Sequence, residues 1–173
     1  MGLYHLYYII STQCKLTTYI LIMSVKNEEK ILCGVIESVI KQTVKPVFWL
    51  IIDDGSTDNS HKIIQNFLSK YDWIKTIRLP PHPRDIIFHV SYVYKYGFDF
   101  ILKYCNENNI EYSFIASIDA DTILETECFG KILNKFETNN KLGIASGGLY
   151  HEINGKLKLS TKVENFPSGT GRV

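Results

Sequence analysis

Short apolar runs alternate with segments of helical apolar spacing along most of this 173-residue chain. Continuous apolar runs rich in β-branched residues are typical of buried strands, and apolar residues at three- and four-residue spacing indicate amphipathic helices. Strands that alternate with helices usually form a parallel sheet with helices packed against it. The sequence therefore predicts one α/β domain with a mostly parallel central sheet.

The expected elements follow from the same patterns. Strands are expected at residues 18–24, 47–52, 73–79, 112–118 and 142–150, and helices at 28–41, 63–68, 90–105 and 127–136. Asn27 is expected to cap the first helix. Asn154-Gly155 predicts a hairpin turn between residues 151–153 and 156–159. Residues 1–16 are expected to form an N-terminal extension, and residues 17–173 the domain.

Composition excludes several kinds of protein. The 19 basic and 18 acidic residues give a net charge of +1, so nucleic acid is not an expected partner. No apolar run approaches the roughly 20 residues that span a bilayer. Cys14, Cys33, Cys105 and Cys128 form no close pair, so buried free thiols in the reducing cytoplasm are expected. The aromatic residues 1–12 leave open a peripheral association with the cytoplasmic face of a membrane.

Acidic and polar residues follow three of the predicted strands directly. These segments are Val25–Glu28, Asp53–Ser56 and Asp119-Ala120-Asp121. If the three strands are parallel neighbours, the carboxylates converge at one sheet edge, where ligands bind in α/β proteins. Carboxylates so close repel one another, and Mg²⁺ or Mn²⁺ would relieve that repulsion. In a strand that continues past the sheet, Asp119 and Asp121 point the same way and can face one ligand.

Each segment alone also has a purely structural interpretation. Asp-Asp-Gly-Ser suits a turn, and Asn-Glu-Glu suits a helix start. The order of the three segments, each after a buried strand, favours a binding site. A doubly wound domain phosphorylated on an aspartate is the alternative enzyme-like class, but its matching lysine at a strand end is not found.

The segments 22–29, 51–60 and 117–121 together resemble the start of a family 2 glycosyltransferase. The resemblance covers residues 19–150. It implies the GT-A fold, whose nucleotide-binding half is Rossmann-like. It further implies a UDP- or GDP-sugar donor, Mg²⁺ or Mn²⁺ as cofactor, and transfer of the sugar with inversion to a hydroxyl of a glycan, lipid or protein.

The same resemblance implies a role for individual residues. The nucleoside pocket would be lined by Ser24, Val25, Asn27 and Glu28. Asp53 and Asp54 would hold the base and ribose, with Asp54 as the partner of a pyrimidine N–H. Asp119 would contact the ribose or a metal-bound water, and Asp121 would ligate the metal. Lys95 stands where relatives often carry an Arg-Asn-x-Gly stretch, and it would approach a phosphate or remain a solvated lysine.

No catalytic residue is assigned from the sequence. An inverting transferase needs a general base for the acceptor hydroxyl, and the resemblance places that acid beyond Val173. The chain is therefore expected to be the donor-binding part of a longer enzyme. The alternative is a non-catalytic form that binds a nucleotide sugar.

Overall fold

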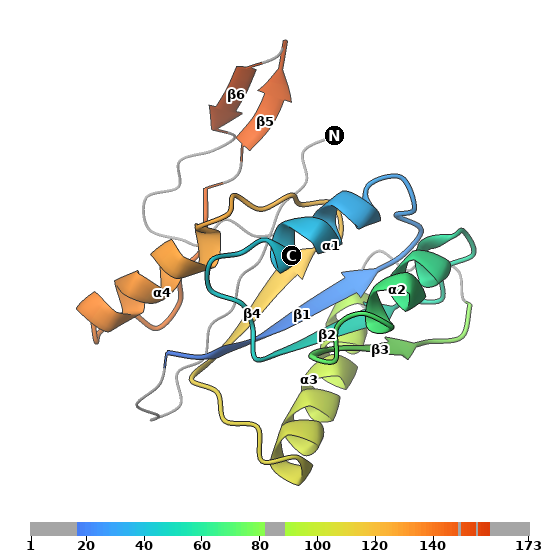
Figure 1. Ribbon diagram of the computed structural model, residues 1–173, viewed down its shortest axis with the longest axis horizontal. Helices are drawn as coiled ribbons and strands as arrows, with labels where there is room; N and C mark the ends of the chain where they lie inside the picture. Colours follow the sequence, from blue (N-terminus) through green and yellow to red (C-terminus); the bar gives the residue numbers. More distant parts are fainter. Residues whose placement is uncertain (1–16, 82–88, 149, 155, 160–173) are drawn as a thin grey trace.

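The computed structural model describes residues 17–81, 89–148, 150–154 and 156–159 (Figure 1). The strands are β1 (Tyr19–Val25), β2 (Phe48–Asp53), β3 (Ile74–Arg78), β4 (Phe114–Asp119), β5 (Tyr150–Ile153) and β6 (Lys156–Leu159). The helices are α1 (Leu32–Ile40), α2 (Ser60–Leu68), α3 (His89–Glu107) and α4 (Cys128–Thr138). The expected extension at residues 1–16 lies outside the described residues.

The central sheet has four parallel strands in the order β3-β2-β1-β4. This confirms the predicted fold class. β5 and β6 pair antiparallel in a separate hairpin that stands apart from the main sheet (Figure 1). Asn154 lies in the turn of this hairpin with a φ of 54°, the left-handed conformation that such turns require.

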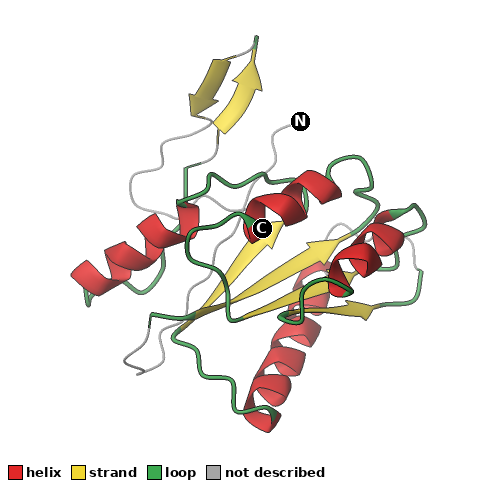
Figure 2. Cartoon of the chain, in the orientation of Figure 1, coloured by secondary structure: helices red, strands yellow, loops and turns green. Residues whose placement is uncertain are grey.

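The sheet lies between two layers of helices (Figure 2). The strands are apolar on both faces, so both faces of the sheet must be covered. α1, α2 and α4 cover one face, and α3 covers the other. Alternate residues of β1 enter the two cores: Leu21 and Met23 face α1, whereas Ile20 and Ile22 face α3. Both clusters are fully buried along β1, so the middle of the sheet is closed to ligands and only its edges can carry a site.

Two expectations about the elements are wrong. α1 begins at Leu32 rather than at residue 28, and Asn27 does not cap it, because Asn27 has a φ of 58° and bonds to another loop. Residues 142–148 form no strand, and β5 begins at Tyr150. This segment contains three glycines, which disfavour an extended strand.

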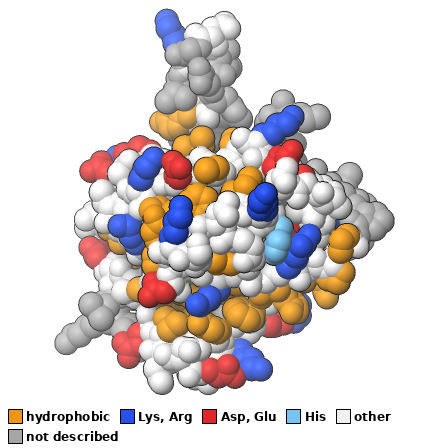
Figure 3. Space-filling model, turned by 45° about the vertical axis from the view of Figure 1, so that its right-hand side comes forward, with side chains coloured by type: hydrophobic (Ala, Val, Ile, Leu, Met, Phe, Trp, Pro, Cys, Tyr) orange, Lys and Arg blue, Asp and Glu red, His pale blue; other side chains and the backbone are white. Residues whose placement is uncertain are grey.

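The surface carries no obvious single-sign patch on the face in Figure 3, where basic and acidic side chains are interspersed. No helix among the described residues combines the length and the apolar character needed to cross a bilayer. Of the described cysteines, Cys105 is buried and Cys128 half-buried, but Cys33 is exposed. All three are free thiols, but the exposure of Cys33 departs from the burial expected from the sequence.

Gly97 lets α3 approach the sheet closely. A Cβ atom at this position would lie 2.5 Å from the Cδ1 atoms of both Ile22 and Ile52, which are fully buried. Overpacking of this kind lowers the free energy of unfolding by about 1–3 kcal/mol, whereas the higher helix propensity of alanine raises it by about 1 kcal/mol. We therefore expect Gly97→Ala to lower the free energy of unfolding by about 1 kcal/mol, measured by urea denaturation.

Gly34 in α1 provides the matched control. Its Cβ would meet only Ile123 Cδ1 at 3.7 Å, an ordinary contact. Gly34→Ala should therefore raise the free energy of unfolding by up to about 1 kcal/mol. If both variants were stabilised to the same extent, the packing of α3 on the sheet would not exclude a side chain at residue 97.

Candidate functional site at the carboxyl edge of the sheet

The carboxyl ends of β1, β2 and β4 meet at one edge of the sheet. The strand register sets Val25 beside Asp53 and Ser24 beside Asp119. β2 and β3 add to one side of β1, and β4 adds to the other side. Ligands in open α/β sheets bind where the strand order reverses in this way. The register thus brings Ser24, Val25, Asp53 and Asp119 to the edge where the fold favours a ligand.

The loop after β1 is hydrogen-bonded to the loop after β2. Asn27 Oδ1 accepts a hydrogen bond from the Thr57 N–H at 2.8 Å. The Asn27 N–H donates to Ser56 Oγ at 3.1 Å, and the Glu28 N–H donates to Ser60 Oγ at 2.9 Å. The side chain and backbone of Asn27 and the backbone of Glu28 therefore connect the two loops.

Glu29, Asp58 and Asn59 extend this network. The Glu29 N–H donates to Asp58 Oδ2 at 3.1 Å, and Glu29 Oε2 accepts from the Asn59 N–H at 3.0 Å and from Nδ2 at 2.8 Å. Burial acts to raise the pKa of Asp58, but hydrogen bonds from Ser60 and from the Glu29 N–H outweigh it and lower the pKa. Asp58 therefore accepts these bonds as a carboxylate at neutral pH.

The Asp53 carboxylate is buried and is bonded to other groups of the protein. Its side chain is 0% exposed, and Oδ1 accepts the Ser56 N–H at 2.9 Å. Oδ2 lies 3.0 Å from His61 Nδ1 and 3.3 Å from Arg78 Nε. Arg78 Nη2 also donates to the Ser56 carbonyl at 3.1 Å. These partners fix the turn at residues 53–56, so the geometry favours a structural use of Asp53 over contact with a nucleoside.

Asp54 pairs with a lysine of the neighbouring loop. Lys26 Nζ donates to the Asp54 carbonyl at 2.7 Å and lies 3.5 Å from Asp54 Oδ2. The Asp54 N–H donates to the Val25 carbonyl at 2.8 Å, while the Val25 side chain is buried in the core. The sequence argument assigned neutralisation of the whole acidic group to a cation. The structure instead neutralises Asp53 and Asp54 with Arg78 and Lys26.

β4 ends at Asp119, and a turn follows directly. The Thr122 N–H donates to the Asp119 carbonyl at 3.2 Å, so Asp121 lies within this turn. The premise that the strand continues to Asp121 is therefore wrong, although both carboxylates stay close to the same strand end. Among the described residues, no three His, Cys, Asp or Glu side chains cluster as a metal site.

Tyr94 reaches this strand end from α3. Its hydroxyl is hydrogen-bonded to the Ser117 side chain, and burial together with the charge of Asp119 raises its pKa. The neighbouring Lys95 is 74% exposed and pairs with Asp99 at 2.6 Å on the surface of α3. The helical turn before Gly97 thus contributes Tyr94 to the site, a residue that the sequence argument did not assign.

Ser38 and Gln42, which the sequence argument also did not assign, hold the segment after Asp121. Ser38 Oγ accepts the Leu124 N–H at 3.1 Å. The buried Gln42 donates through Nε2 to the Glu125 carbonyl at 2.8 Å and accepts the Phe129 N–H at 3.2 Å. Ser38 lies on the buried face of α1 and Gln42 just beyond the end of this helix. In the sequence, only a polar residue at or next to an apolar helix face could have indicated this role.

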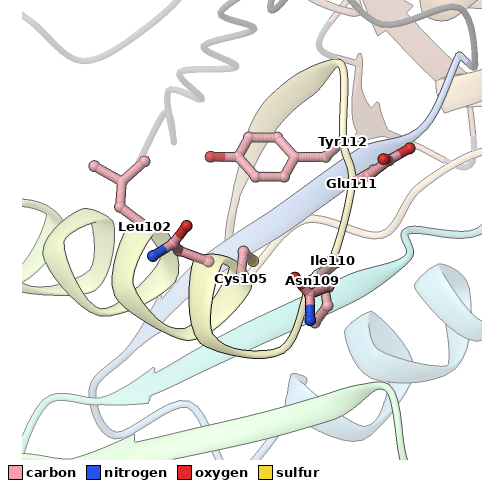
Figure 4. A pocket seen from close by; sticks show the side chains of 7 residues that line it. Leu102, Cys105, Asn109, Ile110, Glu111 and Tyr112 are labelled. Carbon is pink, nitrogen blue, oxygen red and sulfur yellow. The ribbon is translucent and has the colours of Figure 1, made fainter.

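A pocket of about 310 Å³ lies at the opposite edge of the sheet, where α3 leads into β4 (Figure 4). It is lined by residues that include Leu102, Cys105 and Tyr112. Burial raises the pKa of the Cys105 thiol to about 11, so it is protonated at neutral pH and is a poor nucleophile. This pocket is separate from the acidic strand ends.

Comparison with known proteins decides the family. Residues 20–168 match the family model described as glycosyl transferase family 2. The chain belongs to this family. Among curated proteins, no match to this family 2 chain is found.

Solved structures share the fold of this family 2 chain. The structure of S. aureus TarS residues 1–349 is 18% identical with a TM-score of 0.53, over 71% of this chain and 33% of that chain. The same TarS fragment in complex with UDP-GlcNAc has a TM-score of 0.53, over 71% and 32%. A 4-diphosphocytidyl-2C-methyl-D-erythritol synthase is 10% identical with a TM-score of 0.53, over 89% and 73%. This family 2 chain thus spans about a third of the TarS fragment.

Proposed function

We propose that this chain binds a nucleoside-diphosphate sugar with Mg²⁺ or Mn²⁺, and that the protein transfers the sugar with inversion to a hydroxyl of a glycan, lipid or protein. The observation that carries the proposal is the meeting of the β1, β2 and β4 carboxyl ends at a switch point of the sheet. Membership of glycosyl transferase family 2 supports it. The bound UDP-GlcNAc of TarS, which has the same fold, is consistent with such a donor.

The nucleoside would lie over the two linked loops. Ser24 lies near the end of β1, Asn27 and Glu28 follow this strand, and Asp54 follows β2. A base and ribose placed here would therefore meet residues from both strand ends. The hydrogen bonds between the loops hold these residues in place before a ligand arrives. Such an ordered site binds with less loss of conformational freedom than a mobile loop.

The donor set at the end of β4 fits a hard divalent cation. Asp119 and Asp121 offer carboxylate oxygens two residues apart, and Mg²⁺ typically takes one or two protein carboxylates with water and substrate phosphates. Within the part of the chain that the structure describes, no cluster of three acidic, histidine or cysteine residues is found, which is consistent with that mode. When bound, such an ion would act as a Lewis acid on the diphosphate leaving group. Tyr94 and Ser117 would hold the strand end that carries Asp119.

Replacing Asp121 tests the metal assignment. We expect Asp121→Ala to remove the Mn²⁺-dependent part of the affinity for UDP or GDP. The loss should be about 100-fold or more, because even residues that only support a metal ligand are worth about 10–100-fold. Calorimetric titration with Mn²⁺ and with a chelator measures it.

Asp72→Ala is the matched control, because Asp72 is an exposed acid in the turn before β3. It should leave the affinity unchanged. An Asp121→Ala protein that is folded and keeps the full Mn²⁺ effect would contradict the metal assignment. Absence of binding by the wild-type chain to any UDP or GDP ligand would overturn the proposed function itself.

A further inference from the structure

The two acids at the end of β4 are held by different parts of the fold. Asp119 is the last residue of β4, and the pairing of this strand with β1 fixes it beside Ser24. Asp121 lies two residues beyond the strand, within the turn closed by the Thr122 N–H and the Asp119 carbonyl. The position of Asp121 therefore depends also on the segment that follows this turn.

Residues 122–127 lead from the turn to α4 and form neither a helix nor a strand. They run alongside α1, to which their backbone is hydrogen-bonded (Figure 1). The Leu124 N–H donates to Ser38 Oγ at 3.1 Å, and the Thr126 carbonyl accepts the Thr43 N–H at 3.0 Å. The course of this segment is thus set by α1 rather than by the sheet.

Gln42 completes this attachment from a buried position, with 3% of its surface exposed. Its Nε2 donates to the Glu125 carbonyl at 2.8 Å and to the Ser38 carbonyl at 3.2 Å, and its Oε1 accepts the Phe129 N–H at 3.2 Å. An amide donates and accepts at once, so one glutamine binds a carbonyl of the segment and an N–H at the start of α4. With both ends of the amide bonded, the side chain is held in one orientation.

α1 is a fixed support for these bonds. Val35, Ile36 and Val39 of this helix are fully buried in the core. At its start, the Leu32 N–H donates to the Glu28 carbonyl at 2.9 Å, which ties the first turn to the loop after β1. A segment bonded to such a helix cannot shift unless the helix leaves the core.

A cation bound by two carboxylates depends on the distance between them. Mg²⁺ requires nearly ideal octahedral geometry, with ligand oxygens at about 2.0–2.1 Å. Groups that bind a ligand together must in general be held within about 0.5 Å of the required positions. Because the sheet fixes only Asp119, the bonds between α1 and residues 122–127 would set where Asp121 stands.

We propose that Gln42, assisted by Ser38, is a positioning residue for the cation. It acts through the backbone of residues 122–127, which it holds so that the Asp121 carboxylate stays at binding distance from that of Asp119. Gln42 itself contacts neither the cation nor the nucleotide. The inference rests on the proposed donor-binding function and deepens it, because it assigns part of the cation affinity to α1.

Gln42→Met tests the proposal, because it keeps the length of the side chain and removes its hydrogen bonds. The full chain is titrated by calorimetry with UDP or GDP, whichever the wild type binds more tightly, once with Mn²⁺ and once with EDTA. The ratio of the two affinities measures the contribution of the cation. We expect this ratio to fall about tenfold, the lower end of the range for residues that support a metal ligand. The affinity in EDTA should not change.

Ser38 and Phe136 provide the companion variants. Ser38→Ala is a smaller change that removes the acceptor of the Leu124 N–H, and it should lower the ratio less, whereas Ser38→Thr keeps the hydroxyl and should retain the ratio. Phe136→Leu is the matched control. Phe136 is 8% exposed in α4 and packs on Phe114 with 4.8 Å between the ring centroids. Its replacement should lower the melting temperature and leave the ratio unchanged.

The outcomes separate this inference from the function on which it rests. An unchanged ratio in folded Gln42→Met would overturn the inference, since the bonds would then only stabilise the fold. If Gln42→Met does not fold, an unchanged ratio in Ser38→Ala would overturn it in the same way. An equal fall in Phe136→Leu would also overturn it, because any loss of stability would then give the effect. Absence of binding by the wild type to either nucleotide would instead overturn the proposed function.

Discussion

Gly55→Ala is expected to destabilise the chain by about 4 kcal/mol. Gly55 has a φ of 67°, and a residue with a Cβ atom is destabilised by about 1–2 kcal/mol in this left-handed region. The added Cβ would also lie 2.5 Å from the Pro80 carbonyl oxygen and 2.8 Å from Pro81 Cα. Both are backbone atoms, so the clash can be relieved only by moving the chain, at about 1–3 kcal/mol more. A drop of roughly 10 °C in melting temperature should follow, measured by circular dichroism.

Gly143→Ala is the control for this change. A Cβ at Gly143 would meet no atom within 4 Å, so its melting temperature should stay within a few degrees of the wild type. A similarly small change for Gly55→Ala would contradict the close packing of residues 80 and 81 on the turn. Because the turn carries Asp54, the Gly55 variant should also lose nucleotide affinity.

Asp53→Asn is expected to cost about 2–4 kcal/mol. The fully buried carboxylate is the common partner of His61 and Arg78, and loss of one member of a buried pair typically costs about 3–5 kcal/mol. The penalty is reduced here because the Arg78 side chain is 44% exposed and can regain water. The new amide group would also set a donor against the Arg78 guanidinium. Urea denaturation measures the change.

Asp99→Asn tests whether any aspartate would give this result. Asp99 is 63% exposed and pairs with Lys95 along α3, so its loss should cost less than about 0.5 kcal/mol. A different outcome for Asp53→Asn would change the role that we assign to Asp53. If Asp53→Asn kept its stability but lost nucleotide binding, the carboxylate would contact the nucleoside directly, as the family resemblance implies.

The sequence was sufficient for the layered fold because burial leaves a direct trace in it. The strands β1 and β2 are apolar on both faces, so they appear as continuous runs such as residues 47–52. α3 shows helical apolar spacing because Val93, Ile101 and Cys105 of one face are buried against the sheet. The strand expected at residues 142–150 is wrong for residues 142–148. An apolar run forms a strand only where a neighbouring strand is available to pair with it, and the sequence pattern does not show this.

The candidate site was predictable in place but not in the roles of its residues. Strand ends mark the edge, yet the partners of Asp53 and Asp54 come from elsewhere in the chain. Arg78 follows 25 residues after Asp53, and Lys26 precedes Asp54 by 28. Such pairings depend on strand order and register, which the residue pattern does not state. Tyr94 was missed for the same reason, since its partner Ser117 lies on a strand beyond the next loop.

The hydrogen bonds between the loops after β1 and β2 also affect local unfolding. The backbone N–H groups of Asn27, Glu28 and Glu29 donate to side chains of the second loop and of the first residue of α2, and the Thr57 N–H donates to Asn27. Neither loop can open without breaking bonds of the other. The two loops therefore behave as one cooperative unit, in which a single opening event exposes all four amides to solvent exchange.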